Sequence, residues 1–138
     1  MVYLRSLMLW GLIIVVEVAH GNLRALFVAP RLGDLTSRQV AIPIACLINF
    51  GLTWLFVTRL RLSPREAVAV GLLWVLLTAA FEVGLGLALG LPAERIGQDY
   101  DPRRGGFMLF GLTALALTPW LALKMRGRAE RSGAPARP

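Results

Sequence analysis

Two carboxylates lie inside long apolar runs of this 138-residue chain, Glu17 in the first and Glu82 in the third. A charged side chain at mid-membrane depth costs roughly 2.5 kcal/mol or more, so such groups usually face the interior of a bundle and have a partner. His20 and Arg24 follow Glu17 at helical spacing, which places all three side chains on one helix face. The pattern predicts a site for a proton, an ion or a small cation, with Asn49 as a further buried polar candidate.

Small residues accompany both carboxylates and favour close helix packing. Gly21 shares the face of Glu17, and the corresponding face around Glu82 carries Thr78, Gly86 and Gly90. Packing these two faces together would bury both carboxylates near the axis of the bundle. Like charges repel in a low-dielectric site, so at least one of the two glutamates is expected to hold a proton.

A purely structural network is the alternative interpretation of the same residues. Glu17 would then bond to Arg24 or His20, and Glu82 would bond to Thr78 or to a neighbouring backbone group. The sequence leaves both interpretations open, although ionisable groups inside membranes are more often functional.

Cofactor binding is a further alternative, although no cofactor is predicted. Glu17 and His20 have the Glu-x-x-His spacing of di-iron carboxylate bundles, whereas Leu85 stands where a matching second histidine would be needed. A homodimer could still supply four glutamates and two histidines around a metal, and His20 could bind haem or a quinone. The chain contains no phosphate loop, nucleophile elbow or zinc-protease motif, which makes an enzyme the less favoured class.

Four apolar segments must position these residues, at 4–28, 39–58, 67–91 and 106–123. Each approaches the roughly 20 apolar residues that a bilayer-spanning helix needs. The sequence therefore predicts an all-α integral membrane protein, a four-transmembrane-helix bundle over residues 1–125, followed by a disordered basic tail at 126–138. The expected partners are the lipid bilayer and either further copies of the chain or a larger membrane complex.

An internal repeat appears when the sequence is shifted by about 65 residues against itself. Glu17 then matches Glu82, Gly21 matches Gly86, Asp34 matches Asp99 and Thr53 matches Thr118. The predicted repeats cover residues 4–61 and 64–126, each a helix hairpin entering the membrane from the same side. Their expected relation is a parallel pseudo-twofold axis along the membrane normal.

The charge distribution predicts orientation and excludes a nucleic-acid partner. The net charge is +7, and the basic residues gather at the ends of the apolar segments rather than on one soluble face. The ends that include both termini carry the larger share of these residues, which predicts cytoplasmic N- and C-termini. All Lys and Arg residues except Lys124 are arginine, a bias that indicates a GC-rich bacterial genome. The expected location is therefore a bacterial inner membrane.

The two remaining loops are rich in paired charge, at Asp34, Arg38, Asp99, Asp101 and Arg103. Asp34 and Arg38, like Asp99 and Arg103, are four residues apart around an expected helix start. The simple interpretation is therefore helix capping plus local ion pairs within these two couples, each worth under about 1 kcal/mol at a surface. A role in gating the polar cavity is the alternative.

Helix boundaries follow from capping residues and prolines. Ser63 and Asp101, each followed by proline, and Thr36 are expected N-caps, and Pro30 and Pro92 are expected to end the first and third helices.

The function predicted from these features is an oligomeric ion- or proton-coupled transporter or channel subunit. The site would comprise Glu17, Glu82, His20 and Arg24. The alternatives are an accessory or assembly subunit of a larger membrane complex, and a membrane subunit that binds a metal, haem or quinone.

Overall fold

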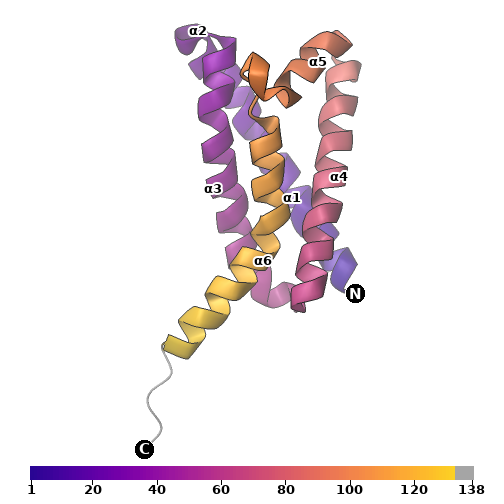
Figure 1. The fold of residues 1–138 in the computed structure, drawn as a ribbon, viewed down its shortest axis with the longest axis vertical. Helices are drawn as coiled ribbons and strands as arrows, with labels where there is room; N and C mark the ends of the chain where they lie inside the picture. The colour runs from indigo at the N-terminus through magenta and orange to yellow at the C-terminus, as the bar shows by residue number, and fades with distance from the viewer. Residues whose placement is uncertain (133–138) are drawn as a thin grey trace, which may run out of the picture.

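The computed structural model describes residues 1–132, and every regular element among them is a helix (Figure 1). In chain order these are α1 (Val2–Leu23), the π-helix η1 (Arg24–Val28), α2 (Ala29–Leu32), α3 (Asp34–Leu60), α4 (Pro64–Ala88), α5 (Ala93–Tyr100), the 3₁₀-helix η2 (Pro102–Arg104) and α6 (Met108–Ser132). The prediction of an all-helical chain is confirmed for this part of the sequence.

Four helical stretches are long and apolar enough to cross a membrane, as the sequence predicted. They are Val2–Leu32, Asp34–Leu60, Pro64–Ala88 and Met108–Ala129. In the most apolar stretch of each, no more than 28% of the residues are buried inside the bundle. Most of the apolar side chains therefore point outward, away from the other helices.

The α6 helix lies in front of the bundle between α3 and α4, and α1 lies behind them (Figure 1). The α6 helix packs along both α3 and α4, whereas α1 packs mainly on α3 and only locally on α4. We call the end that carries α2 and α5 the upper end, and the end with the N-terminus and the α3–α4 turn the lower end (Figure 1).

The hydrophobic core occupies the lower half of the bundle. Its buried residues are Leu9, Ile13, Leu60, Leu62, Ala67, Val70, Trp74 and Leu115. Two indole groups join α1 to α4 there: Trp74 Nε1 donates to the Ser6 carbonyl and Trp10 Nε1 donates to Thr78 Oγ1, both at 3.1 Å. The lower halves of α1 and α4 are thus held together by packing and by hydrogen bonds.

The capping box predicted at Ser63 is confirmed. Ser63 Oγ accepts from the Glu66 backbone N–H, and the Glu66 carboxylate accepts from the Ser63 N–H. Both bonds satisfy backbone donors that the first turn of α4 leaves without a helical partner.

We expect Ser63→Ala to lower the free energy of unfolding by about 1 kcal/mol, because the Glu66 backbone donor loses its acceptor. Thermal unfolding of the detergent-solubilised protein measures this loss. Ser63→Asp keeps a capping oxygen and should unfold near the wild-type temperature; an equal loss in both variants would contradict the capping explanation.

Three predicted helix boundaries were wrong. α3 begins at Asp34 with Gly33 as its N-cap, at a φ of 80°, so Thr36 lies inside the helix and caps nothing. The helical path from α1 continues through Pro30 to Leu32, because a proline in the first turn of α2 needs no N–H donor. Asp101 caps η2 through the Arg103 N–H, and the long helix α6 starts only at Met108.

The end of the chain also differs from the prediction. α6 continues to Ser132, so the first residues of the expected disordered tail are helical. Residues 133–138 of that tail lie outside the described part of the chain.

Candidate functional site

A cavity of about 420 Å³ lies in the upper half of the bundle. Residues of α1, η1, α3, α4 and α5 line it, together with the segment 105–108. It begins above the Trp10–Thr78 hydrogen bond, at Ile14 on α1 and Phe81 on α4. Between α1 and α4 the bundle is therefore packed at its lower end and hollow at its upper end.

The cavity brings together most of the predicted polar cluster. Glu17, His20, Arg24 and Glu82 all line it, as do Arg38 and Asp99 from the predicted loop charges. Asn49, Asp34, Asp101 and Arg103 are not among the lining residues.

The two glutamates face this cavity from different helices. Glu17 Oε2 lies 3.3 Å from His20 Nδ1, while Glu17 Oε1 is buried with no hydrogen-bond partner. Glu82 comes from α4, close enough to Glu17 for the two charges to interact. No ion pair or side-chain hydrogen bond satisfies Glu82 among residues 1–132. Within residues 1–132, the only side-chain partner of the two glutamates is therefore the His20 imidazole, which contacts Glu17.

Arg24 turns away from Glu17. It is the first residue of the π-helix, where the wider turn changes the direction of the side chain relative to a regular α-helix. Its guanidinium donates to Ser37 Oγ at 2.8 Å and lies 3.4 Å from Asp34 Oδ1. Of the two predicted partners for Glu17, the structure shows His20 and not Arg24.

A closed ring of four charges lies at the mouth of the cavity. Arg38 pairs with Asp99 and, at 3.2 Å, with Asp34. Arg95 pairs with the same two carboxylates, at 3.0 Å to Asp34 and 3.1 Å to Asp99. Asp34 and Arg38 belong to α3, and Arg95 and Asp99 belong to α5, so the ring fastens α5 to α3.

The expected pairing of Asp99 with Arg103 was wrong. Asp99 faces inward to Arg38 and Arg95, because it lies on α5, while Arg103 lies on η2 beyond the end of that helix. The Asp34–Arg38 pair is present as predicted. The sequence analysis considered the two loops separately, so it did not predict that Arg95 pairs with Asp34 and Asp99 and links the loops.

The segment after α5 covers the cavity together with that helix. Gln39 Nε2 donates to the Gly105 carbonyl at 3.0 Å, which fixes this segment to α3. Gly106 is buried against the end of α5; a Cβ there would lie 2.1 Å from the Gln98 carbonyl oxygen. Only glycine permits this close approach of two backbones. We call residues 93–106 the roof.

Tyr100, the last residue of α5, lies near the site, although it does not line the cavity. Its hydroxyl is buried with no hydrogen-bond partner. Burial raises the pKa of the Tyr100 phenol, and the nearby charge of Glu82 adds to the effect. The phenol is therefore a neutral donor close to the carboxylate pair.

The remaining predicted residues have other surroundings. Asn49 Oδ1 is buried on α3 without a partner, away from the cavity lining. Thr78 accepts the Trp10 hydrogen bond below the cavity, and Gly86 packs on the Ile96 side chain of the roof. A Cβ at Gly21 would meet nothing within 4 Å, so no close helix contact depends on it.

Gly90 ends α4 instead of packing on another helix. It has a φ of +74°, and the Gly90 and Leu91 N–H groups bond to the Leu87 and Gly86 carbonyls. These are the two bonds of a Schellman motif, which favours glycine at the left-handed position.

No group of three or more His, Cys, Asp or Glu side chains within residues 1–132 is arranged to hold a metal ion. Comparison of the chain with protein-family models, curated proteins and solved structures gives no match. The function must therefore be argued from the geometry of the cavity.

Proposed function

We propose that the chain is an integral membrane protein that binds a proton or small cation between Glu17 and Glu82, as part of an ion- or proton-coupled transporter. The observation that carries the proposal is the position of both carboxylates in one cavity, with Glu17 Oε1 buried and unpartnered.

The apolar outer surface supports the membrane location. Four helices have the length and hydropathy of membrane spans, and large apolar residues such as Met8, Val15, Leu47 and Leu76 are about 70% exposed. In water such a surface would promote aggregation, whereas lipid chains can cover it.

The distribution of charge supports a cationic ligand deep in the cavity. At the mouth, Arg24, Arg38 and Arg95 all lie within ion-pair distance of Asp34, and two of them also pair with Asp99. Of the two deeper carboxylates, Glu17 pairs with His20, and no ion pair within residues 1–132 involves Glu82. Two carboxylates close together in a low-dielectric site cannot both remain charged without a counter-charge. A bound proton or cation supplies that charge.

Packing favours a transporter over an open channel. A channel needs a continuous polar path, whereas the lower half of the bundle is filled by Ile13, Val70, Trp74 and other buried residues. With the termini on the cytoplasmic side, the cavity would open outward and the packed core would form the inner barrier. Release to the inside would then require rearrangement of the lower half.

The proposed internal repeat agrees with one feature of the packing. Thr53 and Thr118, which match in the 65-residue register, are both buried, and their helices α3 and α6 pack along each other. A pseudo-twofold axis between α3 and α6 would place them in this way. A bundle this small has little internal space, so we further propose that the transporter assembles from several copies.

Infrared titration of the purified protein in detergent tests the site without knowledge of the substrate. At neutral pH, where exposed carboxylates with pKa values of about 4 have ionised, we expect the wild type to keep a protonated-carboxyl absorption. Glu17→Gln combined with Glu82→Gln should remove this neutral-pH absorption. In proteoliposomes the same double variant should lose proton flux driven by a membrane potential.

Glu94→Gln is the matched control, because this exposed carboxylate pairs with Arg104 outside the cavity. It should retain the absorption and the flux of the wild type. A double variant with the titration and flux of the wild type would refute the proposed site.

A further inference from the structure

A second hollow lies at the lower end between α1 and α3, where apolar side chains and three arginines line it. Its volume is about 600 Å³, and its apolar lining includes Met8, Leu9, Leu12, Phe56 and Leu60. Met8 and Leu12 lie one turn apart on one face of α1, and both are exposed to the surroundings. We call this hollow the lower groove; it shares no residue with the cavity of the two glutamates.

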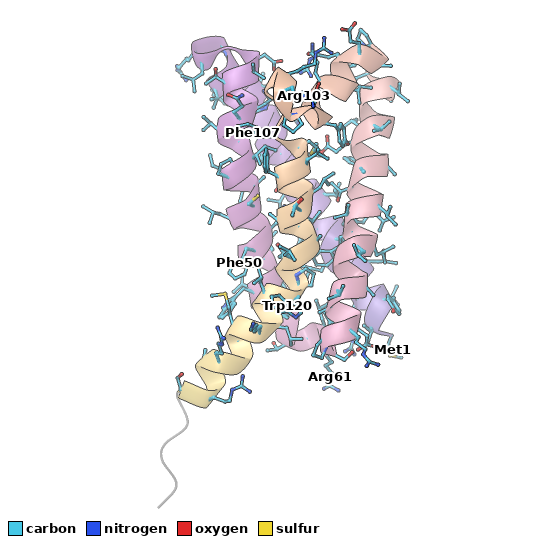
Figure 2. All side chains as sticks on the ribbon, viewed as in Figure 1. Met1, Phe50, Arg61, Arg103, Phe107 and Trp120 are labelled. Atoms are coloured by element: carbon cyan, nitrogen blue, oxygen red, sulfur yellow. The ribbon has the colours of Figure 1, made fainter. Side chains whose placement is uncertain are left out.

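Three arginines line the same groove: Arg5, Arg59 and Arg61. Arg5 donates to the Arg59 carbonyl at 3.1 Å, and the Arg59 guanidinium lies 5.2 Å from the centre of the Phe56 ring. No acidic residue lines the groove, and within residues 1–132 none of the three arginines forms an ion pair. Figure 2 shows Arg61 at the lower end, near Met1 and far from the roof at Arg103.

The order of these residues along α1 matches the order of groups in a membrane lipid. Arg5 is at the helix start, and Leu12 is seven residues further into the apolar span, about 10 Å along the axis. A phosphate at the level of Arg5 would place its acyl chain along Met8 and Leu12. Guanidinium groups bind phosphate oxygens through two parallel hydrogen bonds, which makes arginine well suited to the head group.

We infer that the lower groove is a binding site for an anionic phospholipid, with Arg5, Arg59 and Arg61 around the phosphate and an acyl chain along α1. The inference rests on the membrane location proposed above, but it does not depend on the cation site. A lipid here would fill the gap between α1 and α3 and balance three positive charges that no side chain of the described part neutralises.

Native mass spectrometry of the detergent-purified chain tests the inference, with phosphatidylglycerol and phosphatidylcholine of identical acyl chains as probes. We expect phosphatidylglycerol to bind at least about tenfold more tightly than phosphatidylcholine. Arg5→Gln with Arg59→Gln should reduce its affinity to the level of phosphatidylcholine. Arg65→Gln with Arg128→Gln removes the same charge outside the groove and should leave the preference unchanged.

Three results would overturn the inference: equal binding of the two lipids by the wild type, an equal loss of affinity in both double variants, or full competition by inorganic phosphate. The last result would show that the acyl chain contributes nothing. Leu12→Trp fills the groove without changing its charge and should also lower the affinity for phosphatidylglycerol. The infrared titration of Glu17 and Glu82 should be unaffected by these variants, so failure of one proposal is distinguishable from failure of the other.

Discussion

Gly71→Ala is expected to prevent stable folding of the bundle. Gly71 is buried on α4, and a Cβ placed there would lie 2.0 Å from the Ala116 carbonyl oxygen of α6. The obstacle is backbone, so no side-chain rotation can relieve it, and the two helices must move apart. We expect a loss of about 3 kcal/mol or more in the free energy of unfolding, the upper end of what overpacking costs.

The fraction of monodisperse protein after heating in detergent measures this loss. Gly84→Ala is the control on the same helix, because a Cβ at Gly84 meets nothing within 4 Å. Alanine has the higher helix propensity, so this control should be at least as stable as the wild type. Equal stability of Gly71→Ala and Gly84→Ala would show that α4 and α6 do not approach as closely as described.

Arg38→Gln should release the roof while leaving the bundle folded. It removes one of the two guanidinium groups from the ring with Asp34 and Asp99, so both carboxylates then depend on Arg95. Removing one partner of a fully buried pair costs about 3–5 kcal/mol, and these side chains are partly exposed, so we expect about 1–2 kcal/mol. The amide hydrogens of residues 93–106 should exchange roughly tenfold faster.

Hydrogen exchange followed by mass spectrometry measures the exchange rate of the roof separately from that of the four long helices. Exchange in the lower halves of α1 and α4 should not change, because the core there has no contact with the ring. Arg104→Gln is the control: it breaks the more exposed Arg104–Glu94 pair, and its effect should be under about 0.5 kcal/mol. Uniformly faster exchange in Arg38→Gln would indicate global destabilisation instead of release of the roof.

The sequence was sufficient for the elements dictated by local chemistry. Apolar runs close to the length of a membrane span predicted the four long helices, and Ser63 with Glu66 predicted the start of α4. It failed where tertiary contacts decide the outcome. Gly33, at positive φ, and not Thr36, is the N-cap of α3, and α5 is too short to produce a strong hydropathy signal.

The candidate site was also predictable in part. Helical spacing placed Glu17 beside His20, and the predicted packing of the two carboxylate-bearing faces agrees with the presence of Glu17 and Glu82 in one cavity. Arg24 was misplaced because its π-turn has no sequence signal comparable to a proline or a cap. Arg95 and Tyr100 were missed because their roles depend on how the roof folds back over α3 and α4.

The hydrogen bonds of the Trp10 and Trp74 indoles fix the distance between α1 and α4 in the lower half of the bundle. Up to the level of these bonds the two helices are held together. Above them, each further residue lies about 1.5 Å further along the helix axis from the last bond. A small change in the angle between α1 and α4 would therefore displace the two helices more at the level of Glu17 and Glu82 than in the lower core. At the upper end the ring fastens α5, which follows α4, to α3, so the Arg38–Asp99 and Arg95–Asp34 ion pairs would oppose such a motion.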